Sequence, residues 1–216
     1  MRGAQVRRDE RGNGQPWPTS PRGSRGTLTK FPDPSNGVTE AMVTPAGSGF
    51  GNPICSPVEG QSPRLSRILT DLTDVTINCS VFKHHNLSGV TAAMKNIYGM
   101  IDSPVRFHNN LNTALPKLYA LPQIRNSISL TIVDALVSVT VGDTADPLDF
   151  SPSRIFLAQD PVALDSYALV LLNEIRAAMA NAHPIAIQPI APSLTAWLAN
   201  AAAAGLGSTN YSLVQA

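Results

Sequence analysis

One short stretch of the chain concentrates polar side chains that could bind an anion. It holds two lysines, two histidines, two hydroxyl residues and an amide: Lys83, His84, His85, Ser88, Thr91, Lys95 and Asn96. Ammonium groups and the free N–H groups at a helix start both attract negative charge. We therefore expect Lys83, Lys95, the helix start and His85 to bind a carboxylate, a phosphate or an acidic group of a cofactor. Ser88, Thr91 and Asn96 would add hydrogen bonds, with Thr91 and Lys95 four residues apart on one helix face.

Two aspartates further along the chain could add acid–base chemistry. Asp134 ends an alternating, β-branched segment, and Asp160 follows a third strand-like segment. If the strands are parallel, both carboxylates meet Lys83 and His85 at one edge of the sheet. A histidine that titrates near neutral pH and a carboxylate are suitable partners for proton transfer. The candidate catalytic residues are therefore His85, Asp134 and Asp160.

Each of these residues also has a plain structural interpretation. Asp160 precedes Pro161, so it suits the N-cap of a helix, and Asp165 would interact with the first turn of that helix. Asp134 suits a turn, and a lysine on a helix is usually solvated. The residues are therefore informative as a group rather than singly.

A metal site is the second interpretation of the same side chains. Its candidate ligands are His84, His85, Asp160 and Asp165, with His108 as a further nitrogen donor, a set that suits zinc, iron or manganese. No spacing among them matches a known ligand motif. The chain has two cysteines, too few for an iron–sulfur cluster motif. In this interpretation the protein is a redox accessory that acts with a redox partner protein and without a cluster of its own.

The elements that must position these residues begin after a long polar segment. Residues 1–65 are rich in Gly, Pro, Ser and Arg and lack any sustained period, which predicts disorder and low complexity. The predicted elements then follow: a helical turn at 66–72, strands at 74–82, 127–134 and 154–159, and helices at 90–98, 111–120, 160–179 and 193–204. Strands that alternate with helices predict one three-layer α/β domain over residues 66–216, with a mostly parallel sheet.

Bulk composition excludes some classes of partner. The 216 residues carry a formal charge of +1, which gives no support for binding nucleic acid or a membrane surface. No apolar run approaches the length of about 18 residues that a membrane-spanning helix needs. Arg7-Arg8 lacks the apolar region of an export signal. We therefore expect no nucleic acid, no membrane and, by default, a cytoplasmic location.

Residues 83–99 closely resemble the signature of the domain of unknown function 362 family. That signature has an Asn-containing strand, a Lys-x-His, a Gly-Val-Thr, and then Lys-Asn before an aromatic residue and a glycine. Asp134, the helix start at 160–165 and residues 205–207 also resemble the family, so the similarity covers about 66–216. It implies a fold and site positions but no reaction, because the activity of the family is not established.

The chain departs from the family pattern in two ways. Family members usually begin with a Lys-Pro-Asn motif and an additional strand–helix unit, which residues 1–65 do not resemble. Many relatives also carry a ferredoxin-like module or an export signal, and neither is visible here. The departures suggest an incomplete domain, and a truncated, non-functional fragment with exposed apolar strand edges is the third interpretation.

Overall fold

The computed structural model describes residues 49–53, 57–142, 146, 148–180 and 187–214. Its main sheet has the strand order β3-β6-β7, with β3 at Thr76–Val81, β6 at Ile128–Ala135 and β7 at Arg154–Ala158. Strands β3 and β6 are parallel, whereas β6 and β7 are antiparallel. The predicted α/β class is confirmed. The sheet is mixed, and the arrangement with all three strands parallel, on which the shared site depended, does not hold for β7.

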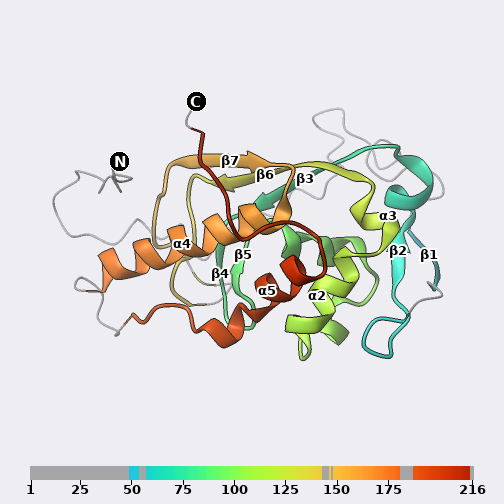
Figure 1. Ribbon diagram of the computed structural model, residues 1–216, viewed down its shortest axis with the longest axis horizontal. Helices are drawn as coiled ribbons and strands as arrows, with labels where there is room; N and C mark the ends of the chain where they lie inside the picture. Colours follow the sequence, from blue (N-terminus) through green and yellow to red (C-terminus); the bar gives the residue numbers. More distant parts are fainter. Residues whose placement is uncertain (1–48, 54–56, 143–145, 147, 181–186, 215–216) are drawn as a thin grey trace, which may run out of the picture.

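Helices lie along one face of this sheet (Figure 1). The longest is α4 (Pro161–Met179), whose apolar stripe includes Leu164, Ala168, Leu171 and Ile175. The residues of this stripe recur every three or four positions, which is the spacing of one buried helix face. Alternate strand residues such as Val133 and Ala135 are buried beneath the helices.

The opposite face of the sheet is apolar and exposed within the described part of the chain. Ile77 and Val81 of β3 and Ile155 and Leu157 of β7 lie on it, and each is exposed. Because a strand alternates its side chains between two faces, these residues point away from the helices. Among the described residues, the helices therefore cover one face of the sheet (Figure 1).

Ordered structure begins earlier than residue 66. Strand β1 (Phe50–Pro53) pairs antiparallel with β2 (Arg64–Ser66), and the side chains of Val58 and Leu65 are buried in the core. The described residues therefore include a strand pair that begins before residue 66. The predicted disorder of residues 1–48 and 54–56 lies outside the described residues.

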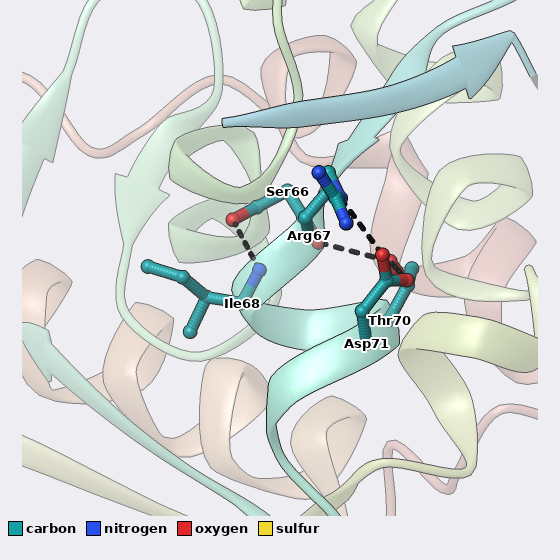
Figure 2. Close-up of polar contacts among 5 residues, drawn as sticks. All are labelled: Ser66, Arg67, Ile68, Thr70 and Asp71. Carbon is teal, nitrogen blue, oxygen red and sulfur yellow. Dashed lines mark hydrogen bonds and ion pairs between the residues drawn. The ribbon is translucent and has the colours of Figure 1, made fainter. Parts of the chain in front are cut away.

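The predicted helical turn after β2 is the π-helical turn η2 (Ile68–Leu72), which polar contacts close at its start (Figure 2). Arg67 Nε donates to Asp71 Oδ2 at 2.8 Å, and Thr70 Oγ1 donates to Asp71 Oδ1 at 2.6 Å. The hydroxyl of Thr70 and the guanidinium of Arg67 lower the pKa of the Asp71 carboxyl. Ser66 Oγ accepts a bond from the Ile68 N–H at 3.3 Å.

The segment predicted as a helix at 90–98 divides into a strand and a 3₁₀ helix. Strand β4 (Lys83–His85) turns back into β5 (Gly89–Thr91), and the 3₁₀ helix η3 covers Met94–Met100. Thr91 is therefore in a strand opposite Lys83, and the expected helical i,i+4 pair of Thr91 and Lys95 does not form.

Two helices, α2 (Leu111–Tyr119) and α5 (Ala196–Ala203), pack against each other. Pro116 lies inside α2 and has no N–H to donate to the carbonyl of Asn112. Asn200 of α5 supplies the missing donor, with Nδ2 at 2.8 Å from the Asn112 oxygen. Trp197 Nε1 of α5 also donates to the Ser88 carbonyl at 3.1 Å, so α5 fixes the turn between β4 and β5.

Short elements complete the chain: α3 at Pro122–Arg125, η4 at Pro104–Phe107 and η5 at Pro192–Leu194. The predicted helices at 111–120, 160–179 and 193–204 are confirmed, with ends that differ by no more than three residues. Over the described residues, no helix combines the length and the apolar character that crossing a membrane requires.

Candidate functional site

The β4–β5 hairpin places two of the predicted basic residues on one face. Lys83 and His85 are two residues apart in β4, so their side chains leave the strand on the same side. Thr91 pairs directly with Lys83 and shares that side. His84 points to the other side, where it is buried and its Nδ1 bonds to the Gly142 carbonyl.

Lys95 stands on η3, next to this face. Its side chain is buried, with a relative exposure of 7% for the residue, and its Nζ lies 3.8 Å from the centroid of the Tyr98 ring. A 3₁₀ helix has three residues per turn, so residues i and i+3 stand directly above one another. That geometry stacks the Lys95 ammonium on the Tyr98 ring, an attraction between a cation and the negative face of an aromatic. The Tyr98 hydroxyl donates to the Phe107 carbonyl at 3.3 Å.

His108, just after η4, completes the group. Its Nδ1 lies 3.0 Å from the Pro104 carbonyl, which can only accept, so Nδ1 carries the ring proton. The neutral ring therefore presents a bare Nε2, which accepts from Lys95 Nζ at 3.2 Å. The His108 ring also stacks on the His85 ring, with centroids 5.8 Å apart. We call Lys83, His85, Lys95, Tyr98 and His108 the lysine–histidine cluster.

Burial makes this cluster electrostatically unusual. Desolvation lowers the pKa of Lys95 to about 8, and the positive charge of Lys83 adds to the effect. Desolvation, together with the charge of Lys95, also lowers the pKa of His108, so the imidazole is neutral near pH 7. Among the described residues, neither Lys83 nor Lys95 forms an ion pair. The nearby Thr91 hydroxyl is buried and has no hydrogen-bond partner in the described part of the chain.

The helix start that was expected to bind an anion is already occupied. The N–H groups of Ala93 and Met94 donate to the two carboxylate oxygens of Asp165, at 2.7 and 2.8 Å. Asp165 is fully buried, and desolvation raises the pKa of its carboxyl to about 7 although both hydrogen bonds act in the opposite direction. The prediction that Asp165 serves the first turn of its own helix is therefore wrong, because its carboxylate holds the start of η3.

Asn96 and Ser88 also bind the protein itself. Asn96 Nδ2 donates to Asn78 Oδ1 at 2.7 Å and to the Cys79 carbonyl at 3.1 Å, which ties η3 to β3. Ser88 is fully buried, and its hydroxyl donates to the Val90 carbonyl at 3.0 Å within the hairpin. Their ligand-binding roles stay predictions, and in this structure both side chains position the elements of the cluster.

The two candidate catalytic aspartates lie at opposite ends of the main sheet. Asp134 is exposed on the open face of the sheet, opposite Ile155 of β7, and its Oδ1 accepts from the Leu136 N–H at 2.9 Å. Asp160 follows the C-terminal end of β7. Because β7 is antiparallel to β6, this end lies at the opposite end of the strands from Lys83. The expected meeting with Lys83 and His85 is therefore wrong for Asp160, whereas Asp134 pairs with Val81, two residues before Lys83.

Asp160 acts as the N-cap that its sequence context indicated. Its Oδ1 accepts from the N–H groups of Val162 and Ala163, each at 2.9 Å. Its Oδ2 accepts from the Ser208 N–H at 2.9 Å, so the same carboxylate also fixes the C-terminal segment. Gly207 packs so closely on this carboxylate that no side chain would fit there.

The candidate metal ligands do not form a ligand set. His84 and His85 point to opposite sides of β4, Asp165 binds two backbone N–H groups, and Asp160 caps α4 at the other sheet edge. In the ranges that the structure describes, no group of three or more His, Cys, Asp or Glu side chains could hold a metal ion. The geometry gives the metal interpretation no support.

Sequence reasoning missed Tyr98 and the contact between Lys95 and His108. The three-residue spacing from Lys95 to Tyr98 was a usable signal, since such residues are neighbours on any helix. The approach of His108 carried no such signal, because it depends on how the η4 turn folds back beside η3.

One family model matches this chain: Domain of unknown function (DUF362), over residues 59–170. This match covers more than half of the sequence. The chain belongs to the DUF362 family. No curated protein and no solved structure matches it.

The DUF362 match includes every member of the lysine–histidine cluster. It starts before β2 and ends within α4, so it spans the whole main sheet and the hairpin. The sequence-based assignment to this family is confirmed.

Proposed function

We propose that this DUF362 protein binds a small anionic molecule at the lysine–histidine cluster. The observation that carries the proposal is a buried ammonium group with a second lysine nearby and no carboxylate partner among the described residues. Burying an unpaired charge is costly, and proteins usually pair such a charge or bind an ion beside it. An anion at the cluster would supply the missing counter-charge.

The partners of the anion would come from two elements. Lys83 and Thr91 belong to the hairpin, and Lys95 belongs to η3, so an anion between them would receive charge-assisted hydrogen bonds from both sides. The unpartnered Thr91 hydroxyl is available as a further donor. Acid–base chemistry at this site would use His108, whose bare Nε2 lies 3.2 Å from Lys95 Nζ, in place of Asp134 and Asp160.

Calorimetric titration with inorganic phosphate and with pyruvate tests the proposal. We expect saturable binding that weakens as salt is added, because salt screens charges that are partly exposed. Replacing Lys83 or Lys95 by methionine removes a charged hydrogen bond worth about 1.5–3 kcal/mol, so affinity should fall about ten- to a hundredfold.

Lys117→Met is the matched control. Lys117 is exposed and pairs with Glu59 at 2.7 Å, outside the cluster, so its loss should leave the affinity unchanged. Equal binding by the wild type, Lys95→Met and Lys117→Met would show that the anion does not use the cluster.

A further inference from the structure

We propose that Lys95 is a nucleophile that condenses with the carbonyl carbon of a 2-oxo acid to form a Schiff base, with His108 moving the proton. The inference rests on the proposed anion binding and deepens it by naming the substrate class. It draws on the contact between Lys95 Nζ and His108 Nε2, and on the second cation at Lys83.

The first requirement is an amine that is neutral near physiological pH. An ammonium group has no lone pair, and with an ordinary pKa of about 10.4 almost every lysine is charged at pH 7.4. Burial and a neighbouring cation are the two means by which proteins activate a lysine for Schiff-base chemistry, and Lys95 has both. With a pKa of about 8, about a fifth of Lys95 is neutral at pH 7.4.

The second requirement is a group that can take and return a proton at the reacting nitrogen. His108 meets it, because its other ring nitrogen is held by the Pro104 carbonyl and its Nε2 faces Lys95. The charged and titratable groups around Lys95 are Lys83 on β4, His85 stacked on His108, Tyr98 beneath the ammonium, and His108 itself. Within the described residues, no carboxylate is among the groups that shift the pKa of Lys95.

The chemistry balances without any further reactant. The Lys95 lone pair attacks the carbonyl carbon, the C=O π electrons move to oxygen, and the amine proton passes to His108 Nε2. His108 returns that proton to the alkoxide, which gives the neutral carbinolamine. As the nitrogen lone pair forms the C=N bond, the second amine proton passes through His108 Nε2 to the hydroxyl, which leaves as water. The sum is amine plus ketone giving imine plus water, and His108 ends as it began.

The substrate class follows from the two cations. A 2-oxo acid has its carboxylate bonded directly to the carbonyl carbon. When the carbonyl carbon of such a ligand lies at Lys95, its carboxylate is therefore close enough to bind a second positively charged side chain. Lys83 is that cation, and a simple aldehyde or ketone would have no group for it to bind.

Reductive trapping with pyruvate tests the inference. The full chain is incubated with pyruvate and sodium cyanoborohydride, which reduces an imine to a stable amine, and the adduct is located by peptide mapping. The four lysines are Lys30, Lys83, Lys95 and Lys117, so one digest of the wild type compares them directly. We expect the adduct on Lys95, at least tenfold above Lys117, with a yield that rises with pH around 8.

Two variants separate chemistry from folding. Lys95→Arg keeps a positive charge but cannot form an imine, so it should bind pyruvate in the calorimeter and show no adduct. His108→Gln should form the adduct about a hundredfold more slowly, the lower end of what a positioned acid–base group contributes. The wild-type map decides the question even if a variant fails to fold.

The outcomes distinguish this inference from the proposed function. Pyruvate binding that depends on Lys83 and Lys95, with no adduct on Lys95, would overturn the nucleophile and leave anion binding in place. Labelling spread equally over Lys95 and Lys117 would also overturn it. Neither binding nor labelling would overturn both proposals.

Discussion

At the scale of single residues, the buried ammonium group of Lys95 lowers the free energy of unfolding of the protein. Its folded pKa of about 8 lies below the ordinary value of 10.5, so the unfolded chain binds this proton more tightly than the native protein does. The penalty is fully present below pH 8, shrinks as pH rises from about 8 to 10.5, and disappears above that range. A side chain kept at such a cost is characteristic of a functional site.

Lys95→Met should therefore stabilise the protein at pH 7. We expect a gain of about 1–3 kcal/mol in the free energy of unfolding, because methionine fills similar space without a buried charge. The gain should shrink steadily between pH 8 and 10.5. Urea unfolding of both proteins across this range measures it, with Lys117→Met as the exposed control. A loss of stability at pH 7 would mean that Lys95 is structural.

At the scale of elements, the cluster depends on the β4–β5 hairpin and on what packs against it. Gly89 begins β5 with a φ of +72°, a conformation that residues with a Cβ rarely adopt. A Cβ there would lie 2.6 Å from Ile190 Cγ2 and 2.7 Å from Thr195 Cγ2. The glycine therefore permits both the turn and the close approach of the segment that leads into α5.

Gly89→Ala should destabilise the protein by about 2–4 kcal/mol, the sum of left-handed backbone strain and a steric clash. Gly99 is the matched control, since it lies exposed in η3 with no atom within 4 Å of a built Cβ. Gly99→Ala should leave stability unchanged or raise it by up to about 1 kcal/mol. Thermal unfolding of the two variants compares them, and equal melting temperatures would contradict the packing described.

The elements also show which site features a sequence can predict. Lys83, His85 and Lys95 are close in the chain, so their local grouping could be predicted from the sequence. The direction of β7 could not, because strand orientation depends on pairing with β6, and this direction removed Asp160 from the site. The 3₁₀ helix η3 begins where Asp165, about 70 residues further along the chain, accepts hydrogen bonds from the N–H groups of Ala93 and Met94. In the helix predicted at 90–98, these N–H groups would lie within the helix.

At the scale of the whole molecule, the open sheet face is the least expected feature. Ile155 and Leu157 of the edge strand β7 are each 61% exposed, and the exposed Ile77 and Val81 of β3 lie on the same face across the central strand β6. Contiguous apolar surface of this kind promotes association or aggregation.

The double change Ile155→Lys and Leu157→Lys should reduce self-association, because charged side chains on an edge strand oppose pairing and stacking. Each site is exposed, so stability should change by no more than about 0.5 kcal/mol per substitution. Val105→Lys is the control, since Val105 is 74% exposed on η4, away from the sheet. Sedimentation velocity over a concentration series measures the difference. A wild type that stays monomeric throughout would contradict it.

The most direct test of the central claim is an NMR titration of the lysine Cε resonances, with and without phosphate. We predict that Lys95 titrates near pH 8 in the free protein and that a bound anion moves its pKa upward by about 1–3 units, since a nearby negative charge favours the ammonium form. Lys117 should not move. A Lys95 resonance that titrates near 10.5 and ignores phosphate would contradict the account.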